Sequence, residues 1–266
     1  MTSQAIPVMF VHGLWLHADS WGPWMDLFRE AGYEPTAPGW PGESATIEET
    51  RKSPDRVAGH GLDDIVAHYV DAMRGLSSKP IVIGHSFGGL IVQRLLGEGH
   101  ASAAASIDGA PTRGIYILPV SSLRVASIAL RNPANRNRAV SLTRAQWRYG
   151  FGNAISAEES DELYDRWATP SPGKPLFEAA FANFFPHSPA KVATDNATRG
   201  PLLLTLGGKD HTVGPAIPRA AYKLYRKSPA VTELEEFPDR GHSLCIDHGW
   251  REVADTVLTW LKQNSL

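Results

Sequence analysis

Residues 84–88 read Gly84-His85-Ser86-Phe87-Gly88, a G-x-S-x-G pattern between a β-branched run and a stretch typical of a helix. In a sharp strand-to-helix turn the serine takes a strained backbone conformation, and the flanking glycines leave room for it. The turn places the hydroxyl at a helix N-terminus, where the helix dipole and free N–H groups favour a developing negative charge. The pattern predicts that Ser86 is a nucleophile; the alternative is a glycine-rich turn with an incidental serine.

A serine hydroxyl needs a base before it attacks a carbonyl carbon. Of the ten histidines we select His242, which follows the last predicted strand and precedes the last predicted helix. Such a loop lies at the carboxyl edge of a parallel sheet, the edge at which Ser86 is also expected. His12 and His85 are assigned to their own turns. We predict that His242 takes the proton of Ser86 and later gives it to the leaving group, the alternative being a solvated loop histidine.

Asp210 is the candidate acid that would orient this histidine. It lies in Gly207-Gly208-Lys209-Asp210, directly after the penultimate predicted strand. Its role would be to accept a hydrogen bond from His242 and to stabilise the imidazolium. Asp108 is the rival acid, because it too ends a predicted strand, and a turn aspartate without a role is the alternative for Asp210.

An oxyanion hole would complete such a site. The N–H of Phe87, directly after the nucleophile, is one predicted donor. The other is expected from the loop His12-Gly13-Leu14-Trp15, where Gly13 permits a close backbone approach. We assign it to the N–H of Leu14, with that of Trp15 as the alternative. Loss of one such donor typically costs about 3–4 kcal/mol of transition-state stabilisation.

Strands and amphipathic stretches alternate along most of the chain, which indicates a mostly parallel sheet with helices on both faces. The predicted strands are residues 6–11, 33–37, 80–83, 103–107, 201–206 and 231–237, and the main helices between them are 21–32, 62–76, 89–96, about 218–225 and 250–261.

Residues 112–198 interrupt this alternation and contain no convincing buried strand. Their pattern predicts helices over 115–130, 144–151, 158–168 and 176–185. We interpret 112–198 as a helical cap inserted over the carboxyl edge of the sheet. Residues 1–111 and 199–266 would then form the core.

These motifs together resemble the α/β-hydrolase superfamily. The resemblance rests on His12-Gly13, the turn from Pro38 to Ser44, the G-x-S-x-G turn, residues 207–210 and Gly241-His242, in the chain order serine, acid, histidine. It implies an α/β-hydrolase sheet of about six strands, because the two leading strands usual in the family are absent. Within the superfamily the chain is similar to compact bacterial serine esterases and lipase-like enzymes. The Val213-Gly214-Pro215 sequence after the acid departs slightly from the usual Val-Pro.

The cap would shape the substrate pocket. Aromatic residues expected in that pocket are Trp15, Trp40, Phe181, Phe184 and Phe185, although such a stripe can equally be core between cap and sheet. Between residues 109 and 157 there are seven arginines and no acidic residue. We prefer the interpretation that cap helices pair these charges with the acidic residues that follow. The alternative is a surface that attracts anionic substrates or a membrane.

Composition narrows the function further. The 266 residues carry 26 Lys+Arg against 28 Asp+Glu, which argues against nucleic acid as the main partner. The single cysteine, Cys245, permits no intrachain disulfide and favours a reducing compartment. With no signal peptide and no run of 18 apolar residues, we expect a cytoplasmic protein without integral membrane association.

The predicted activity is hydrolysis of uncharged or weakly anionic carboxylic esters through an acyl-enzyme, with a small-molecule ester as the partner and no metal or organic cofactor. The same triad could act on C–C, lactone or amide bonds or as a perhydrolase. A third class is a non-catalytic receptor that uses the pocket only for binding. The sequence leaves the oligomeric state open.

Overall fold

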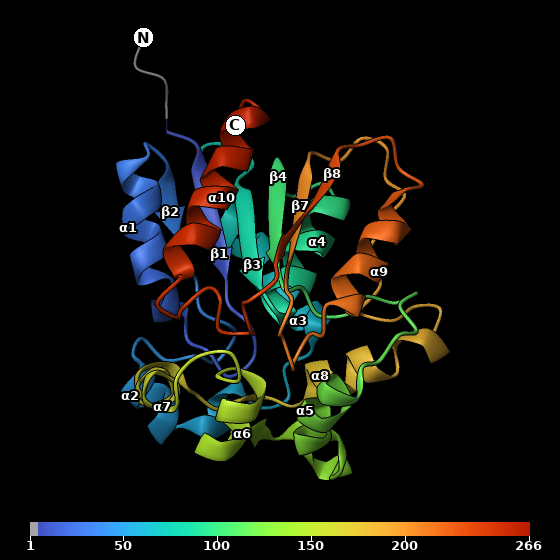
Figure 1. The fold of residues 1–266 in the computed structure, drawn as a ribbon. Coiled ribbons are helices and arrows are strands. Elements are labelled where there is room, and N and C mark those ends of the chain that lie inside the picture. Colours follow the sequence, from blue (N-terminus) through green and yellow to red (C-terminus); the bar gives the residue numbers. More distant parts are fainter. Residues whose placement is uncertain (1–4) are drawn as a thin grey trace.

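The computed structural model describes residues 5–266 and contains one six-stranded sheet in which all neighbouring strands are parallel. The order across the sheet is β2-β1-β3-β4-β7-β8 (Figure 1). The predicted sheet of about six mostly parallel strands is therefore confirmed. Its strands are β1 (Pro7–Val11), β2 (Glu34–Thr36), β3 (Ile81–His85), β4 (Ala103–Ile107), β7 (Leu202–Gly207) and β8 (Thr232–Phe237).

Helices cover both faces of the sheet, because the central strands are apolar on both sides. On one face, Phe10 and Ile83 pack in a buried cluster with Trp24 and other residues of the outer helices α1 (Gly22–Glu30) and α10 (Trp250–Gln263). On the opposite face, a second cluster joins Val82 and Leu204 to the helices α3 (Leu62–Met73), α4 (Phe87–Gly97) and α9 (Ala216–Tyr225).

The remaining helices gather beyond the carboxyl ends of the strands, in the lower part of Figure 1. The chain between β4 and β7 supplies a small helical insertion, which agrees with the predicted inserted cap. It comprises α5 (Val120–Leu130), α6 (Arg144–Gly150), α7 (Ala157–Trp167) and α8 (Lys174–Ala180), with a two-stranded antiparallel pair, β5 (Ala139–Val140) and β6 (Ser171–Pro172). The short α2 (Ile47–Lys52) and the 3-10 helices η1 (Ala18–Trp21), η2 (Pro54–Val57), η3 (Pro133–Asn137) and η4 (Ala182–Phe184) complete the fold.

Two of the predicted helices in this insertion differ from the structure. The helix expected to start at residue 115 begins at Val120, because Pro119 holds an extended conformation and disfavours helix before it. The helix expected over 176–185 divides into α8 and η4. The side chain of Asn183 accepts a hydrogen bond from Gly114 N and donates one to Ile115 O, each at 2.7 Å. These tertiary bonds fix a local geometry that helix propensity does not encode.

Charge pairing within the insertion follows the preferred interpretation only in part. Arg144 and Arg148 on α6 contact Asp165 and Asp161 on α7 at 2.6 and 2.8 Å. For the other five arginines of the acid-free stretch, residues 5–266 supply no ion-pair partner; these are Arg113, Arg124, Arg131, Arg136 and Arg138. Among residues 5–266, no helix is long and apolar enough to cross a bilayer.

Candidate active site

Ser86 occupies the sharp turn between β3 and α4, with φ 58° and ψ −121°. This left-handed conformation is costly for a residue other than glycine and is kept by the packing around it. A Cβ added at Gly84 would collide with the carbonyl oxygen of Gly88, and one added at Gly88 would collide with that of Val11. Both glycines are therefore sterically required, as the motif predicts.

The loop after β1 passes directly over this serine. A Cβ at Gly13 would lie 2.7 Å from the Cβ of Ser86, so only glycine permits the approach. The N–H of Trp15 donates to Ser171 Oγ at 2.6 Å and is occupied. In the described residues the N–H of Leu14 has no acceptor, and Phe87 N–H is at the first position of α4, where helical N–H groups lack a partner. The N–H groups of Leu14 and Phe87 are thus free to donate, and their assignment to an oxyanion hole stays a prediction.

His242 and Asp210 form a fully buried hydrogen-bonded pair. Nδ1 of His242 donates to Oδ2 of Asp210 at 2.6 Å, and neither side chain is exposed. The second carboxylate oxygen of Asp210 accepts from the backbone N–H groups of Thr212 and Val213, at 2.6 and 2.8 Å. Burial opposes the ionised form, but His242 and these hydrogen bonds outweigh it and lower the pKa of Asp210. The result is a carboxylate held in one orientation toward the imidazole.

The other nitrogen of the imidazole, His242 Nε2, is buried and has no hydrogen-bond partner among the described residues. The ring lies against His85, with centroids 4.5 Å apart, and against Phe151 at 4.7 Å. Nε2 of His85 donates to the carbonyl oxygen of His242 at 2.9 Å, and burial lowers the pKa of His85, so this ring is neutral. Ser86 and His242 are not joined by a hydrogen bond here; such bonds often form only when substrate is bound.

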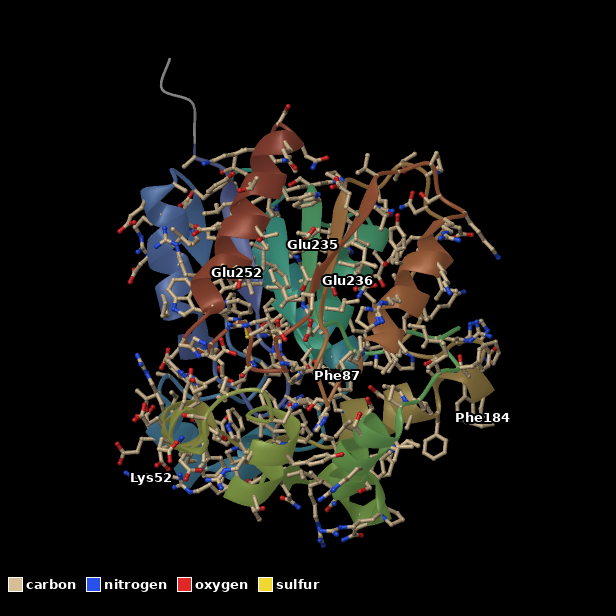
Figure 2. All side chains as sticks on the ribbon, viewed as in Figure 1. Lys52, Phe87, Phe184, Glu235, Glu236 and Glu252 are labelled. Atoms are coloured by element: carbon tan, nitrogen blue, oxygen red, sulfur yellow. The ribbon has the colours of Figure 1, made fainter. Side chains whose placement is uncertain are left out.

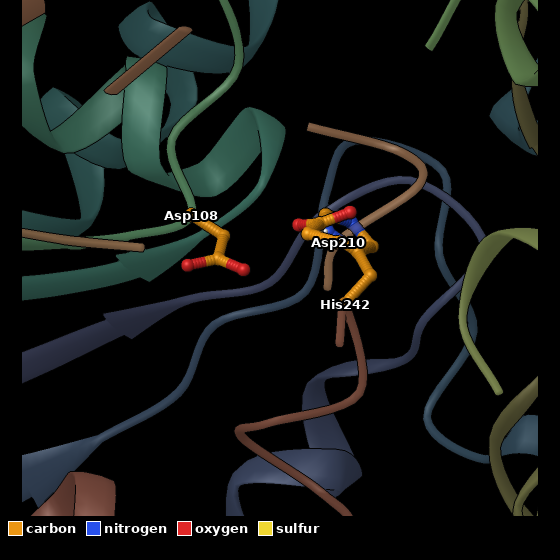
Figure 3. Close-up of side chains that lie close together, drawn as sticks. All are labelled: Asp108, Asp210 and His242. Carbon is orange, nitrogen blue, oxygen red and sulfur yellow. Dashed lines mark hydrogen bonds and ion pairs between the residues drawn. The ribbon is translucent and has the colours of Figure 1, made fainter. Parts of the chain in front are cut away.

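Asp108, the rival acid, makes no hydrogen bond to His242, and in Figure 3 it lies apart from the overlapping side chains of Asp210 and His242. Its φ is 44°, its side chain is fully buried, Oδ1 accepts from Gly207 N at 2.9 Å, and the carboxyl group is hydrogen-bonded to that of Asp210. Burial, reinforced by the charge of Asp210, raises the pKa of Asp108 well above its usual value. Asp108 is therefore a neutral carboxylic acid beside an ionised one.

Asp108, Asp210 and His242 each offer one possible metal-ligand atom, and these atoms lie within 4.8 Å of one another. The His242–Asp210 contact of 2.6 Å is, however, shorter than the separation of about 3.3 Å between two ligands of a tetrahedral zinc ion at about 2.0 Å. A shared proton, and not a metal ion, suits that distance.

Glu43, in the turn from Pro38 to Ser44, is a buried carboxylate that the sequence analysis does not identify. It contacts His12 Nε2 at 3.2 Å and His17 Nε2 at 3.5 Å, and it accepts from Ala18 N at 3.2 Å. Burial opposes its ionisation, but the two histidines outweigh it and lower its pKa. Glu43 thus ties this turn to the loop that carries Leu14. No local motif marks it, because its partners come from another segment.

A cavity of about 510 Å³ opens beside Ser86 and Phe87, and the wall formed by the described residues has no charged side chain. Its polar side chains are mostly occupied: Thr112, Ser122, Asn183 and Thr212 all make hydrogen bonds to the backbone. Ser86 also lines the wall, and its hydroxyl makes no hydrogen bond to any other described residue. The cavity therefore suits an apolar group next to a reactive hydroxyl.

The aromatic residues predicted for the pocket separate into two groups. Trp15 and Phe184 contribute to the cavity wall. Trp40 does not, because its ring stacks on His12 with centroids 5.1 Å apart, inside the core. Phe181 and Phe185 also lie outside the wall; they project to the surface and are 48% and 60% exposed. Apolar residues of α5 take their place, chiefly Leu123, Val125 and Ala126.

Comparison with known proteins agrees with this fold. Residues 8–256 match the family model described as Alpha/beta hydrolase family. Similar solved structures include a monoacylglycerol lipase from Paleococcus ferrophilus (19% identity, TM-score 0.67, covering 97% of this chain and 94% of that one) and a methylesterase from Arabidopsis (16%, 0.66, 97% and 99%). Tomato methylketone synthase I is similar at 14% identity, TM-score 0.67, covering 98% and 99%. No curated protein sequence matches the chain. Identities this low show a shared fold only.

Proposed function

This chain belongs to the alpha/beta hydrolase family, and we propose that it is a serine hydrolase that cleaves carboxylic esters through an acyl-enzyme. The observation that carries the proposal is the buried His242–Asp210 pair, whose Nε2 is free and whose loop is hydrogen-bonded to His85, the residue directly before the strained Ser86. A fixed base beside a hydroxyl at a helix N-terminus is the arrangement that makes serine nucleophilic. In this proposal residues 112–198 form the cap, and 5–111 with 199–266 form the core; residues 1–4 of the predicted core lie outside the described residues.

In the acylation step, Ser86 Oγ attacks the acyl carbon and His242 Nε2 accepts the hydroxyl proton. The carbonyl oxygen becomes an oxyanion that accepts hydrogen bonds from the N–H groups of Phe87 and Leu14. Collapse of this intermediate breaks the bond to the alkoxy group, which leaves as the alcohol with the proton from His242. In deacylation His242 takes a proton from water, whose oxygen attacks the acyl carbon. The second intermediate collapses as His242 returns that proton to Ser86 Oγ, which breaks the acyl–serine bond and releases the carboxylic acid. Asp210 stabilises the imidazolium in both steps.

The cavity supports an apolar ester as the substrate class. A wall without charged side chains gives a carboxylate or ammonium group no partner, and burying such a group unpaired is costly. The volume of about 510 Å³ is large enough for an acyl chain of several carbons. Ester-cleaving enzymes are named among similar structures, yet tomato methylketone synthase I shares the fold as well. The fold alone therefore does not fix the bond that is cleaved.

Turnover of p-nitrophenyl butyrate tests the proposal directly. Wild type should hydrolyse it, and Ser86→Ala and His242→Ala should each lose at least about a thousandfold in kcat/KM. Ser127→Ala and His248→Ala are matched controls, since both residues are exposed. A fluorophosphonate probe should label wild type at Ser86 and leave Ser86→Ala unlabelled. Unchanged turnover by Ser86→Ala refutes the mechanism, and activity only toward lactones, amides or C–C bonds refutes the substrate class. Stable ligand binding without turnover would indicate a receptor.

A further inference from the structure

Exposed large hydrophobic side chains are concentrated in the insertion between β4 and β7. Eight of the nine found in residues 5–266 lie within 116–123 and 181–185, and the ninth is Val231. Three of the eight are more than three-quarters exposed: Tyr116 at 78%, Val120 at 82% and Phe184 at 77%. An apolar surface of this kind is uncommon unless it contacts something. We call the eight residues the apolar patch: Tyr116, Ile117, Leu118, Val120, Leu123, Phe181, Phe184 and Phe185.

The two segments of the apolar patch are held together and surround the opening of the cavity. Asn183 is hydrogen-bonded to Gly114 N and Ile115 O, and Arg113 Nε donates to Phe185 O at 3.1 Å. Four patch residues also line the cavity that contains Ser86: Tyr116, Leu118, Leu123 and Phe184. Figure 2 shows Phe184 projecting from the edge of the molecule, on the side of the insertion. The interior of the cavity is thus continuous with an exposed apolar surface.

Basic side chains extend this surface along α5. Val120, Leu123, Arg124, Ser127 and Arg131 recur at three- and four-residue steps and are all exposed, so they share the outer face of the helix. That face is apolar toward its N-terminal end and basic toward its C-terminal end. The described residues provide no ion-pair partner for Arg124 or Arg131, although the guanidinium of Arg124 lies 3.9 Å from the centre of the Tyr149 ring. No acidic residue occurs from 109 to 157. An apolar face beside unpaired arginines is typical of surfaces that bind anionic lipid.

We propose that the apolar patch and the arginines of α5 dock this protein on a negatively charged lipid surface, so that substrate passes from lipid into the cavity. Any occupant of the patch also covers the cavity opening. A second protein copy would close that opening against substrate, whereas a lipid surface supplies apolar molecules to it. The unpaired positive charges select an anionic surface. This interaction goes beyond the proposed ester hydrolysis, and its test does not depend on turnover.

Binding is measured with Ser86→Ala, so that no lipid is consumed, by co-sedimentation with large vesicles. The vesicles are phosphatidylcholine alone, or phosphatidylcholine with phosphatidylglycerol at about 3:1. Binding to the anionic vesicles should exceed binding to the neutral ones at least about tenfold and should weaken strongly at 0.5 M salt, because screening removes the charge attraction. Equal and negligible binding to both vesicle types refutes the proposal.

Two variants and their controls, each made in the Ser86→Ala protein, separate the apolar from the charged contribution. Ile117→Ser with Val120→Ser removes two exposed patch residues outside the cavity wall and should weaken vesicle binding at least about tenfold. Val231→Ser, the exposed hydrophobic outside the patch, should bind normally. Arg131→Gln should weaken binding roughly fivefold, while Lys227→Gln, an exposed residue elsewhere, should not. Equal losses in the variants and their controls contradict a patch-specific surface.

The remaining outcomes also decide. Concentration-dependent dimers that the Ile117→Ser/Val120→Ser variant abolishes, without vesicle binding, overturn the proposal in favour of a second copy as the occupant. With Ser86 intact, that variant should keep wild-type turnover of dissolved p-nitrophenyl acetate and lose turnover of p-nitrophenyl laurate embedded in anionic vesicles. If the variant lost turnover of both substrates, impaired docking would not be the cause of its lower activity on the vesicle-embedded ester. If no ester is cleaved at all, the proposed function fails, but vesicle binding by Ser86→Ala still stands or falls separately.

Discussion

Replacing Asp108 with asparagine tests the charge of the second buried carboxyl group beside His242. In the folded protein Asp108 is neutral, because burial and the charge of Asp210 raise its pKa. The amide of asparagine has almost the same shape, is also neutral, and can still accept from Gly207 N through its oxygen. The substitution therefore leaves the net charge of the site unchanged at neutral pH. Other titratable groups near Asp108 are Asp247 and Cys245, and burial raises the pKa of each.

If Asp108 were instead ionised, the effect of removing its charge on His242 would follow from the distance between the two side chains. A carboxylate oxygen of Asp108 and a ring nitrogen of His242 lie within 4.8 Å of each other. If Asp108 were ionised, removing its charge at that distance would change the energy of protonated His242 by roughly 3.5 kcal/mol at an effective dielectric constant of about 20. That change corresponds to about 2.5 pH units in the acid limb of the kcat/KM profile. A neutral Asp108 predicts a shift below about 0.5 unit, so the two cases are well separated.

The assay is kcat/KM for p-nitrophenyl butyrate from pH 5 to pH 9 with wild type, Asp108→Asn and Asp239→Asn. Asp239 is a highly exposed control whose charge is screened. Asp108→Asn should keep its acid limb and lose less than about tenfold in kcat, whereas Asp210→Asn should lose about a thousandfold or more. An acid limb displaced downward by more than about one unit in Asp108→Asn would refute the neutral assignment.

The same raised pKa has a stability consequence with a definite sign. Above the unfolded pKa of about 4, the unfolded chain releases a proton that folded Asp108 retains. The free energy of unfolding of wild type therefore carries a penalty that grows as pH rises from about 4 toward the raised folded pKa. Asp108→Asn removes it, so urea unfolding should show its stability relative to wild type improving between pH 4 and pH 8. A constant difference would contradict a raised pKa.

Three further predictions concern the surroundings of the site. Gly88→Ala should destabilise the protein by about 3 kcal/mol or more in urea unfolding, because its Cβ meets the backbone of Val11, while Gly75→Ala, where the added Cβ has open space, should cost less than about 1 kcal/mol. Glu43 has a lowered pKa, so its stabilising contribution is present above about pH 4.5 and is lost as pH falls. The free energy of unfolding of Glu43→Gln should therefore be about 1–3 kcal/mol lower than that of wild type at pH 7. If the same difference persisted at pH 3, the lowered pKa of Glu43 would be contradicted. Ala126→Phe narrows the cavity, so kcat/KM for p-nitrophenyl octanoate should fall at least about tenfold while that for the acetate stays within about threefold; equal losses on both esters would mean that Ala126 does not limit the acyl chain.

The sequence predicts those features that depend on neighbours along the chain. The four central strands β1, β3, β4 and β7 are largely apolar runs, whereas β2 and β8 at the edges carry exposed polar residues. The structure places all six within one or two residues of the expected limits. Part of the G-x-S-x-G turn is local in the same sense, since Gly84 is required by its contact with the backbone of Gly88; Gly88 itself is required by the distant backbone of Val11 and is predicted only through the motif. Hydrophobic periodicity and turn-forming residues are properties of short segments, and they can therefore be predicted from the sequence.

Features that depend on distant partners are much less predictable. The division of the expected helix over 176–185 follows from Asn183 bonding residues 114 and 115. Trp40 leaves the expected pocket because His12, from another segment, stacks on it. The choice between Asp108 and Asp210 as the partner of His242 is equally non-local. Both residues end strands, and only their three-dimensional placement distinguishes them.

The order of strands in the sheet explains why this site needs residues outside the three predicted catalytic ones. Ser86, Asp108, Asp210 and His242 follow β3, β4, β7 and β8, which are consecutive across the sheet. At about 4.8 Å per strand, β8 lies roughly 14 Å from β3, so the loop after β8 must return toward Ser86. The hydrogen bond from His85 to the carbonyl oxygen of His242 fastens that loop next to the nucleophile. Asp210, which reaches the imidazole from the loop after β7, is in turn flanked by a neutral Asp108 that adds no second charge. The geometry of the base thus depends on a histidine and an aspartic acid whose roles are positional and electrostatic.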